Sequence, residues 1–399
     1  MTTVYPQVRL RPGRDFTLRA GHPWVFSGAL SEVPAGLPAG SVVDVLDATG
    51  DFVARGHLHP RNSLAFRALT RNPDELIDVA FYRSRIARAA ALRALLPASV
   101  TGYRLIHSEA DGLPGIVVDR YDRWLVAQIT TAGAERERPL LIEALTEQTH
   151  AEGILFRDDP KVREREGLSV GKPVVPYGEV PSEVEIREGS FRMLVDPWAG
   201  QKTGFFLDQR DKRAQVAVLA PHLKSLLNAF SYTGGFSLAA LSANAALHTV
   251  NCDSSTPALS LARRNYELNG HDPAAHDFVE DDVTRYLQRC VDTHQRFDLV
   301  VLDPPAFAKT LAARERALRG YEHLNSLGAR VIAPGGLLLT CSCSGGVSGE
   351  DFETVVRQGL VRAGRAGQIV ASFGPSLDHP TLPGFSEDRY LKALVLRLD

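Results

Sequence analysis

An acid and a thiol stand at the ends of two successive predicted strands of this sequence. Residues 299–307 form an apolar run that ends in Asp303 and a Pro-Pro pair, and residues 340–344 end the next strand with Cys343. In an open parallel sheet both strand ends open on one edge, where ligands bind. A thiolate there could add to C6 of a pyrimidine, while an acid stabilises the developing charge. The spacing therefore predicts Cys343 and Asp303 as catalytic residues.

A second cysteine, Cys341, competes for this role, because residues two apart on a strand face the same side. Either thiol could instead be a small buried residue at a strand end. The rigid Pro-Pro pair could hold the carbonyl groups of Pro304 and Pro305 toward a planar base. Phe307 could stack on that base. Enzymes that methylate exocyclic amines usually have an aromatic residue directly after Pro-Pro, where this chain has Ala306.

A glycine turn between a strand at 225–230 and a helix at 236–246 is typical of a nucleotide site. Its N–H groups and the helix N-terminus would face the ligand, and Asp253, 19 residues after Gly234, would accept from ribose hydroxyls. The glycine pattern is not the G-x-G-x-x-G of dinucleotide sites. Its absence favours a ligand that has an adenosine but no pyrophosphate, such as S-adenosylmethionine. Asp282, expected at the end of a third strand, would accept from the adenine amine. The alternative is a plain turn with acids that cap helices.

A polar segment, residues 201–210, precedes this sheet, and Lys202 and Arg210 within it could hold a carboxylate or a phosphate. The alternative is a solvated hairpin that leads into a helix at 209–220.

Three domains are expected to position these residues, as the length of 399 residues suggests. Residues 1–72 read as short strands and a hairpin, typical of a small β-barrel. Residues 73–190 read as a linking helix at 73–96 followed by a central α+β domain, and the helix has an apolar stripe with Leu76 on it and Arg85 and Arg93 largely off it. Residues 191–399 alternate strands and helices, which predicts a doubly wound α/β sheet.

Composition places few limits on the partners of the chain. The net charge of −2 does not indicate a nucleic-acid partner, although residues 1–72 hold eight arginines against five acids. The four cysteines form no C-x-x-C pair, so we expect no metal site and reduced thiols. No apolar run of about 18 residues occurs, and the sequence begins without an apolar leader. We therefore expect a cytoplasmic protein without a membrane partner.

Motifs along the whole chain resemble those of the large-subunit ribosomal-RNA methyltransferase I family, the PUA-linked class I methyltransferases that make 5-methylcytosine. They are Gly-His-Pro-Trp-Val-Phe-Ser (21–27), Arg-Leu-Ile-His (104–107), Glu-Ala-Asp-Gly-Leu-Pro-Gly (109–115), Val-Asp-Arg-Tyr (118–121), the 201–210 segment, Tyr-Thr-Gly-Gly-Phe (232–236), Asp-Pro-Pro (303–305) and Ser-Cys-Ser (342–344). The family thiol lies within Ser-Cys-Ser, and so the resemblance selects Cys343.

The resemblance implies a PUA barrel, a central domain and a Rossmann-like methyltransferase domain, with 23S ribosomal RNA as substrate and often a homodimer. S-adenosylmethionine is the implied cofactor, and its implied contacts are Lys202, Gln209, Arg210, Phe230, Tyr232, Gly234, Asp253, Asp282 and Asp303. The RNA contacts expected beside Pro304, Pro305 and Phe307 are Arg19 and His22 of the PUA barrel, whereas Trp24 is expected in its core. Relatives often have Lys where this chain has Ala306.

Lys309, Arg314, Arg316 and Arg319 could add a local basic surface, or they could form a solvated helix face. Two other functions stay open. One is a methyltransferase of guanine N2 or adenine N6 that uses Asp303 without a cysteine nucleophile. The other is a ribosomal-RNA-binding assembly factor without catalysis.

Overall fold

The structure is a computed structural model, and it describes residues 4–307 and 313–399. Contacts between residues group the chain into two compact units. The first unit consists of residues 1–184, 195–207 and 377–386, and the remaining residues form the second unit. Within the described ranges, no helix is long and apolar enough to cross a membrane. In the same ranges, no group of three or more His, Cys, Asp or Glu side chains is arranged to hold a metal ion.

The first sheet of the first unit has the strand order β2-β6-β5-β4-β1-β3. Its elements are β1 (Gln7–Leu10), α1 (Phe16–Arg19), β2 (Trp24–Phe26), β3 (Leu30–Glu32), β4 (Ser41–Leu46), β5 (Phe52–Leu58) and β6 (Leu64–Thr70). The predicted hairpin is present as the antiparallel pair β4 and β5, in which Val43 pairs with Gly56. Side chains such as Val8, Val43 and Phe66 fill its core.

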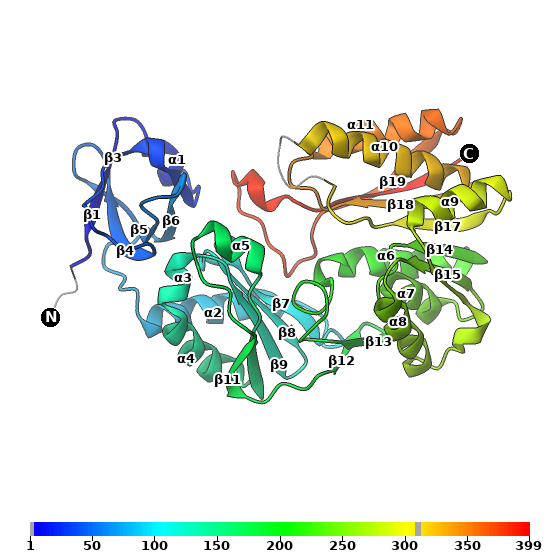
Figure 1. The fold of residues 1–399 in the computed structure, drawn as a ribbon, viewed down its shortest axis with the longest axis horizontal. Coiled ribbons are helices and arrows are strands. Elements are labelled where there is room, and N and C mark those ends of the chain that lie inside the picture. Colours follow the sequence, from blue (N-terminus) through cyan, green and yellow to red (C-terminus); the bar gives the residue numbers. More distant parts are fainter. Residues whose placement is uncertain (1–3, 308–312) are drawn as a thin grey trace. The chain divides into compact units, whose positions relative to one another are not determined.

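The second sheet has the strand order β11-β10-β9-β8-β7, with helices packed on it (Figure 1). Its strands are β7 (Gly102–His107), β8 (Ile116–Tyr121), β9 (Trp124–Ile129), β10 (Gly153–Phe156) and β11 (Val174–Gly178). Its helices are α2 (Val79–Arg93), α3 (Ala132–Arg136), α4 (Arg138–Thr149) and α5 (Pro160–Arg165).

Helix α2 is shorter than the helix expected at 73–96. It begins after Asp78 because the Asp78 carboxylate caps it, accepting a 3.0 Å hydrogen bond from the Phe81 N–H. Leu76 therefore precedes the helix and is exposed. Arg85 and Arg93 are buried, contrary to expectation, because their guanidinium groups pair with the carboxylates of Glu75 and Asp111.

A segment from the far end of the chain completes the first unit. Arg93 pairs with both oxygens of Asp111 at 2.7 Å and also donates to the main-chain oxygen of Asp378. The Asp378 carboxylate accepts from the Arg104 N–H at 2.8 Å. The ring of Phe385 lies edge-on to Trp24, with 4.8 Å between the centroids. Residues 377–386 are thus held in the first unit by the hydrogen bonds of Asp378 with Arg93 and Arg104 and by the ring contact of Phe385 with Trp24.

The third sheet has the order β16-β15-β14-β17-β18-β20-β19, in which only β20 runs antiparallel to its neighbours β18 and β19. Its strands are β14 (Ser225–Ala229), β15 (His248–Asp253), β16 (Asp277–Glu280), β17 (Phe297–Leu302), β18 (Ile332–Ser342), β19 (Gly367–Phe373) and β20 (Lys392–Leu398). A separate hairpin, β12 (Val184–Glu188) and β13 (Phe191–Val195), precedes it in the chain.

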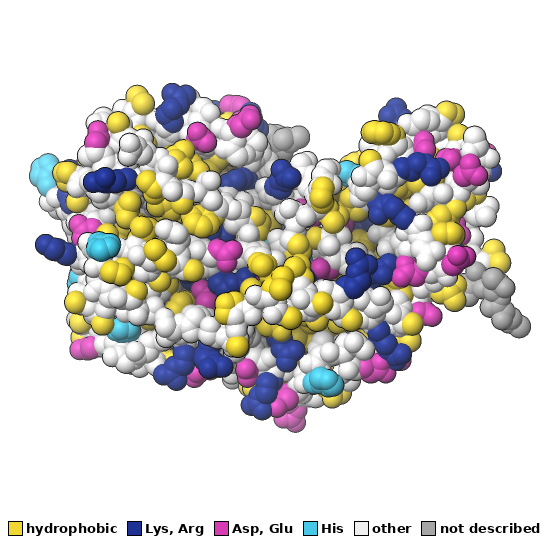
Figure 2. Space-filling view, turned by 180° about the vertical axis from the view of Figure 1, so that it is seen from behind, with side chains coloured by type: hydrophobic (Ala, Val, Ile, Leu, Met, Phe, Trp, Pro, Cys, Tyr) yellow, Lys and Arg dark blue, Asp and Glu magenta, His cyan; other side chains and the backbone are white. Residues whose placement is uncertain are grey.

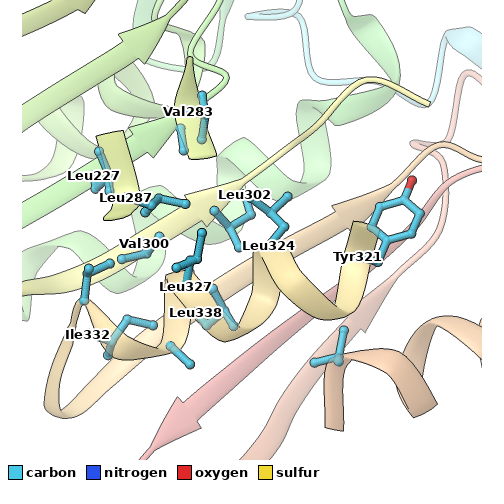
Figure 3. Packing of buried hydrophobic residues seen from close by; sticks show 14 of the residues in the cluster. Leu227, Val283, Leu287, Val300, Leu302, Tyr321, Leu324, Leu327, Ile332 and Leu338 are labelled. Carbon is cyan, nitrogen blue, oxygen red and sulfur yellow. The ribbon is translucent and has the colours of Figure 1, made fainter. Parts of the chain in front are cut away.

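Helices cover both faces of the third sheet, which makes it doubly wound (Figure 1). One face carries α6 (Arg210–Leu219), α7 (Gly235–Ala243) and α8 (Thr256–Leu268), and the other carries α9 (Val283–Asp292), α10 (Arg314–Arg330) and α11 (Gly349–Arg362). Figure 3 shows Leu287, Leu324 and Leu327 of these helices against Val300 and Leu338 of the sheet. Burying one such side chain stabilises the fold by about 1.5–3 kcal/mol.

Candidate active site

Four loops meet at one edge of the third sheet. Strands β14, β15, β17 and β18 are parallel neighbours, so their carboxyl ends lie on the same edge. Phe230 follows β14, Asp253 ends β15, Asp303 follows β17, and Cys343 follows β18. The strand order reverses between β14 and β17, and ligands bind at such a switch point in open α/β sheets. The structure therefore brings predicted cofactor and catalytic residues together at the edge where a ligand is expected.

The turn after β14 has an unusual backbone conformation. Phe230, Tyr232 and Gly234 have positive φ angles of 62°, 46° and 85°. Asp253 fixes this turn, because its carboxylate accepts a 2.8 Å hydrogen bond from the Tyr232 N–H. A non-glycine residue in this conformation costs on the order of 1–3 kcal/mol, and such residues concentrate at ligand sites. The turn ends at the N-terminus of α7, whose first N–H groups have no partner within the helix.

The groups around this turn fit the predicted S-adenosylmethionine. Within residues 4–307 and 313–399, the buried hydroxyls of Ser231 and Thr233 have no hydrogen-bond partner. The N-terminus of α7 suits a carboxylate. Asp253 also accepts from the Ser255 N–H at 2.9 Å, and a carboxylate has about four lone-pair sites, so it retains capacity for a ribose hydroxyl.

Replacing Asp253 with alanine is expected to weaken S-adenosylmethionine binding about 10- to 100-fold, because a hydrogen bond to a charged group contributes about 1.5–3 kcal/mol. Isothermal titration calorimetry would measure the dissociation constant. Asp277→Ala is the matched control, because Asp277 is an exposed acid at the start of β16. Equal affinities for the two variants would contradict the role of Asp253.

Asp282 lies after β16 and caps α9. Its carboxylate accepts a 3.0 Å hydrogen bond from the Arg285 N–H, and its side chain is exposed. The neighbouring Asp281 is the less exposed of the two acids and pairs with Arg285 and Arg289. The structure thus places Asp282 in the capping role that the sequence left open, and a contact with adenine stays a prediction.

Asp303 is held by a side chain from a distant segment. Gln209, directly before α6, is buried and donates a 2.7 Å hydrogen bond from its amide nitrogen to the half-buried Asp303 carboxylate. Sequence reasoning named Gln209 as a cofactor contact and did not foresee this bond. The amide fixes the orientation of the carboxylate.

The two competing cysteines have different environments. Strand β18 ends at Ser342, so Cys343 lies beyond the strand, where strand alternation no longer applies. Cys341 is fully buried, and burial together with the charge of Asp303 raises the pKa of its thiol well above the ordinary value. Cys343 is half-buried, and its Sγ lies 3.7 Å from the main-chain oxygen of Pro304. Of these two cysteines, Cys343 is the one that is partly exposed.

The residues that follow Asp303 differ in their burial. Pro304 is buried, Pro305 is exposed, and the Phe307 ring packs against Tyr321 of α10 at 4.7 Å between centroids. The Tyr321 hydroxyl in turn bonds the Ser344 hydroxyl at 2.9 Å. Tyr321 therefore connects the loop after Asp303 with the loop after Cys343, a role that no pattern in the sequence indicated.

The basic residues predicted near this loop separate into different groups. Arg314 pairs with Asp351 at 2.5 Å, whereas Arg316 and Arg319 are exposed. Lys309 lies outside the described residues. On the face shown in Figure 2, Lys and Arg side chains are interspersed with Asp and Glu, in keeping with the small net charge.

The 201–207 part of the polar segment belongs to the first unit. The Thr203 hydroxyl donates to the buried Asp119 carboxylate and bonds the Tyr121 hydroxyl at 2.8 Å. Lys202 is exposed, has a φ of 54°, and places its ammonium 4.6 Å from the centre of the Phe206 ring. The segment is thus fixed by buried polar contacts and is not a solvated hairpin. Arg210, in the second unit, is buried at the start of α6.

The predicted RNA contacts of the first sheet also have protein partners. Arg19 is exposed and pairs with Asp15 at 2.8 Å and with Asp47 at 2.7 Å. The His22 ring lies 5.3 Å from that of Phe385. The Trp24 indole donates to Glu109 at 2.9 Å. Contact of Arg19 and His22 with RNA stays a prediction.

A doubly wound sheet with a strained glycine turn, an acid that fixes this turn, and an acid and a thiol at its switch point is typical of an S-adenosylmethionine-dependent methyltransferase. Residues 175–394 match the family described as S-adenosylmethionine-dependent methyltransferase, and residues 8–71 match the PUA-like domain. These matches confirm the predicted cofactor and fold class.

Similarity over nearly the whole chain identifies the particular family. Proteins named Ribosomal RNA large subunit methyltransferase I, from Alteromonas mediterranea and Photobacterium profundum, are each 41% identical to this chain. The alignments cover 98% of the chain and 98% of the first relative, and 99% of the chain and 98% of the second. The chain belongs to the ribosomal RNA large subunit methyltransferase I family, as its motifs predicted.

Solved structures confirm the fold. A crystal structure of SMU.776 complexed with SAH superimposes with a TM-score of 0.84 at 20% sequence identity, covering 99% of this chain and 100% of that one. A second structure, of a protein from Streptococcus mutans, gives a TM-score of 0.83 at 20% identity, covering 98% of this chain and 100% of that one. The fold of this chain is therefore shared with proteins of low sequence identity.

Proposed function

We propose that this protein methylates C5 of a cytosine in 23S ribosomal RNA through a covalent bond between Cys343 and C6 of the base. The names of the relatives that match the whole chain support a large-subunit ribosomal RNA as the substrate. One observation carries the chemistry. Cys343 is partly exposed and its Sγ lies 3.7 Å from the main-chain oxygen of Pro304, the residue after Asp303, while Cys341 is buried.

The reaction needs covalent activation because C5 of cytosine is a poor nucleophile. Cys343 loses its proton to solvent and adds to C6, which breaks the C5=C6 π bond and makes C5 electron-rich. As the thiolate adds, N3 takes up a proton from water, and the Asp303 carboxylate accepts a hydrogen bond from this N3–H or from the exocyclic amine, which stabilises the protonated ring. The bound S-adenosylmethionine supplies the methyl group for C5. C5 then loses its proton to water, the double bond re-forms, and the C6–S bond breaks to release the Cys343 thiolate. The N3 proton returns to water when the thiolate leaves.

The target base must leave its stack to reach this edge of the sheet, as in other enzymes that modify bases. Pro305 is exposed beside Asp303 and could contact the base. Phe307 packs on Tyr321 through part of its surface and remains partly exposed, which leaves an edge for stacking. Arg19 and His22 are proposed to contact RNA outside the reacting base, and two copies of the chain are proposed to form a homodimer.

The product identifies the reaction. Incubating the protein with tritiated S-adenosylmethionine and ribosomal RNA from cells that lack the enzyme is expected to place the label in 5-methylcytidine, as measured by nucleoside chromatography. Label in a guanosine or adenosine methylated on its amine would contradict the covalent mechanism. No label in free RNA or in ribosomal subunits would indicate a binding factor instead.

A further inference from the structure

Lys392 holds the loop that carries Cys343. It is the first residue of β20, directly opposite Ser342 at the end of β18. Its ammonium donates 2.7 Å hydrogen bonds to the main-chain oxygens of Ser344 and Val347. One cation therefore joins both sides of the turn that follows Cys343.

The charged groups around Lys392 come from three elements. Cys343, in the loop after β18, and Asp351 of α11 both act to raise the pKa of its ammonium. Asp351 is already bound by Arg314 of α10 and by the Ser348 N–H, so its own charge is largely compensated. The neighbouring Tyr321 of α10 is neutral in the ordinary pH range, because burial raises the pKa of its hydroxyl. Of these three groups, the thiolate form of Cys343 is thus the one that the positive charge of Lys392 would stabilise most.

The partial burial of Lys392 affects the charge state of its ammonium. Burial lowers the pKa of its ammonium to about 8, while Cys343 and Asp351 act in the opposite direction. The ammonium is therefore mostly charged at pH 7 and loses its proton as the pH rises through about 8. An ammonium has three donors, and the two carbonyl groups use two of them.

We propose that Lys392 is a positioning residue that stabilises the thiolate form of Cys343 by placing a positive charge beside it. The thiol proton goes to solvent and the ammonium keeps its own protons, so no proton passes between the two groups. The effect on catalysis rests on the proposed function, whereas the effect on the thiol does not. A neighbouring opposite charge typically lowers an acid's pKa by about one to three units.

The ionisation of Cys343 can be measured without RNA. The rate of alkylation by iodoacetamide would be followed from pH 5.5 to 9.5, with the modified peptide identified by mass spectrometry. Cys252, Cys290 and Cys341 are buried, which makes Cys343 the thiol that reacts in the folded protein. We expect Lys392→Met to raise the apparent pKa of alkylation by at least about one unit, which lowers the rate at pH 7 about tenfold.

Two further variants separate charge from loop structure. Lys392→Arg keeps the charge, and we expect it to keep the alkylation pKa close to that of the wild type. Lys392→Gln keeps a donor for the carbonyl groups but removes the charge, and we expect it to behave like Lys392→Met. A folded Lys392→Gln protein, checked by circular dichroism, with a wild-type alkylation profile would overturn the proposal.

Methyl transfer provides the second measurement. With saturating S-adenosylmethionine, Lys392→Met should lower kcat about tenfold at pH 7, with KM for RNA unchanged, and the loss should diminish at pH 9 as the thiol ionises unaided. A kcat loss that is constant with pH would contradict thiolate stabilisation. If the product were not 5-methylcytidine, the proposed function would fail, and the alkylation profile would still decide the role of Lys392.

Discussion

Replacing Cys343 with alanine is expected to abolish methyl transfer, lowering the single-turnover rate on the order of 10⁴-fold or more, while S-adenosylmethionine binds as in the wild type. The size of this loss follows from removing a nucleophile, since the remaining site residues cannot activate C5 by addition to C6. The thiol lies in the loop after β18, and cofactor contacts are expected at the turn after β14. Rapid-quench transfer of a labelled methyl group and calorimetric cofactor binding would measure the two effects separately.

Cys341 provides the matched control, two residues away. Its thiol is fully buried, so Cys341→Ala should cost stability, on the order of 1 kcal/mol, through a small cavity and should leave the single-turnover rate nearly unchanged. A denatured wild-type complex with RNA that retains a covalent bond at Cys343 would add direct support. The opposite pattern, an inactive Cys341→Ala and an active Cys343→Ala, would move the chemistry to a different residue.

The elements of the third sheet were predictable because each one carries its own local signal. The strand expected at 297–302 is observed as Phe297–Leu302, since a continuous apolar run is typical of a strand covered on both faces. The helix expected after Asp253 begins where Ser255 caps it by accepting from the Ala258 N–H. Such patterns span only a few residues, and so the sequence displays them directly.

Buried charges were not predictable in this way. The apolar stripe of α2 placed Arg85 and Arg93 largely off the core, yet they are 9% and 3% exposed. Their partners are Glu75 and Asp111, and Arg93 also binds the main chain of Asp378. An Arg is buried only where a carboxylate or carbonyl group compensates its charge, and the sequence does not show which distant group will do so.

In the candidate site, too, local sequence patterns were predictable and contacts between distant residues were not. Asp303 and Cys343 were predictable because strand ends in a parallel sheet converge on one edge. Gln209 lies 94 residues from Asp303, and Lys392 lies 48 residues from Ser344, and no spacing rule connects such pairs. The residues proposed to do the chemistry were therefore visible in the sequence, whereas the residues that contact and orient them required the fold.

The second large effect is expected for Asp303→Asn, which preserves the shape of the side chain and removes its charge. Removing one preorganised electrostatic partner of a reaction typically lowers kcat about 10²- to 10³-fold. The amide can still pair with Gln209 through its oxygen, so the folded structure should be retained. Single-turnover methyl transfer, with thermal unfolding as the check on structure, would measure the loss.

Gln209 tests whether the orientation of Asp303 contributes to this rate. Because the Gln209 amide holds the Asp303 carboxylate at 2.7 Å, Gln209→Ala should lower the rate about tenfold through misorientation. In the double variant the carboxylate is already absent, so the rate should match that of Asp303→Asn alone. Independent, multiplicative losses would show that Gln209 acts on the reaction by another route, whereas coincident rates would establish that it acts through Asp303.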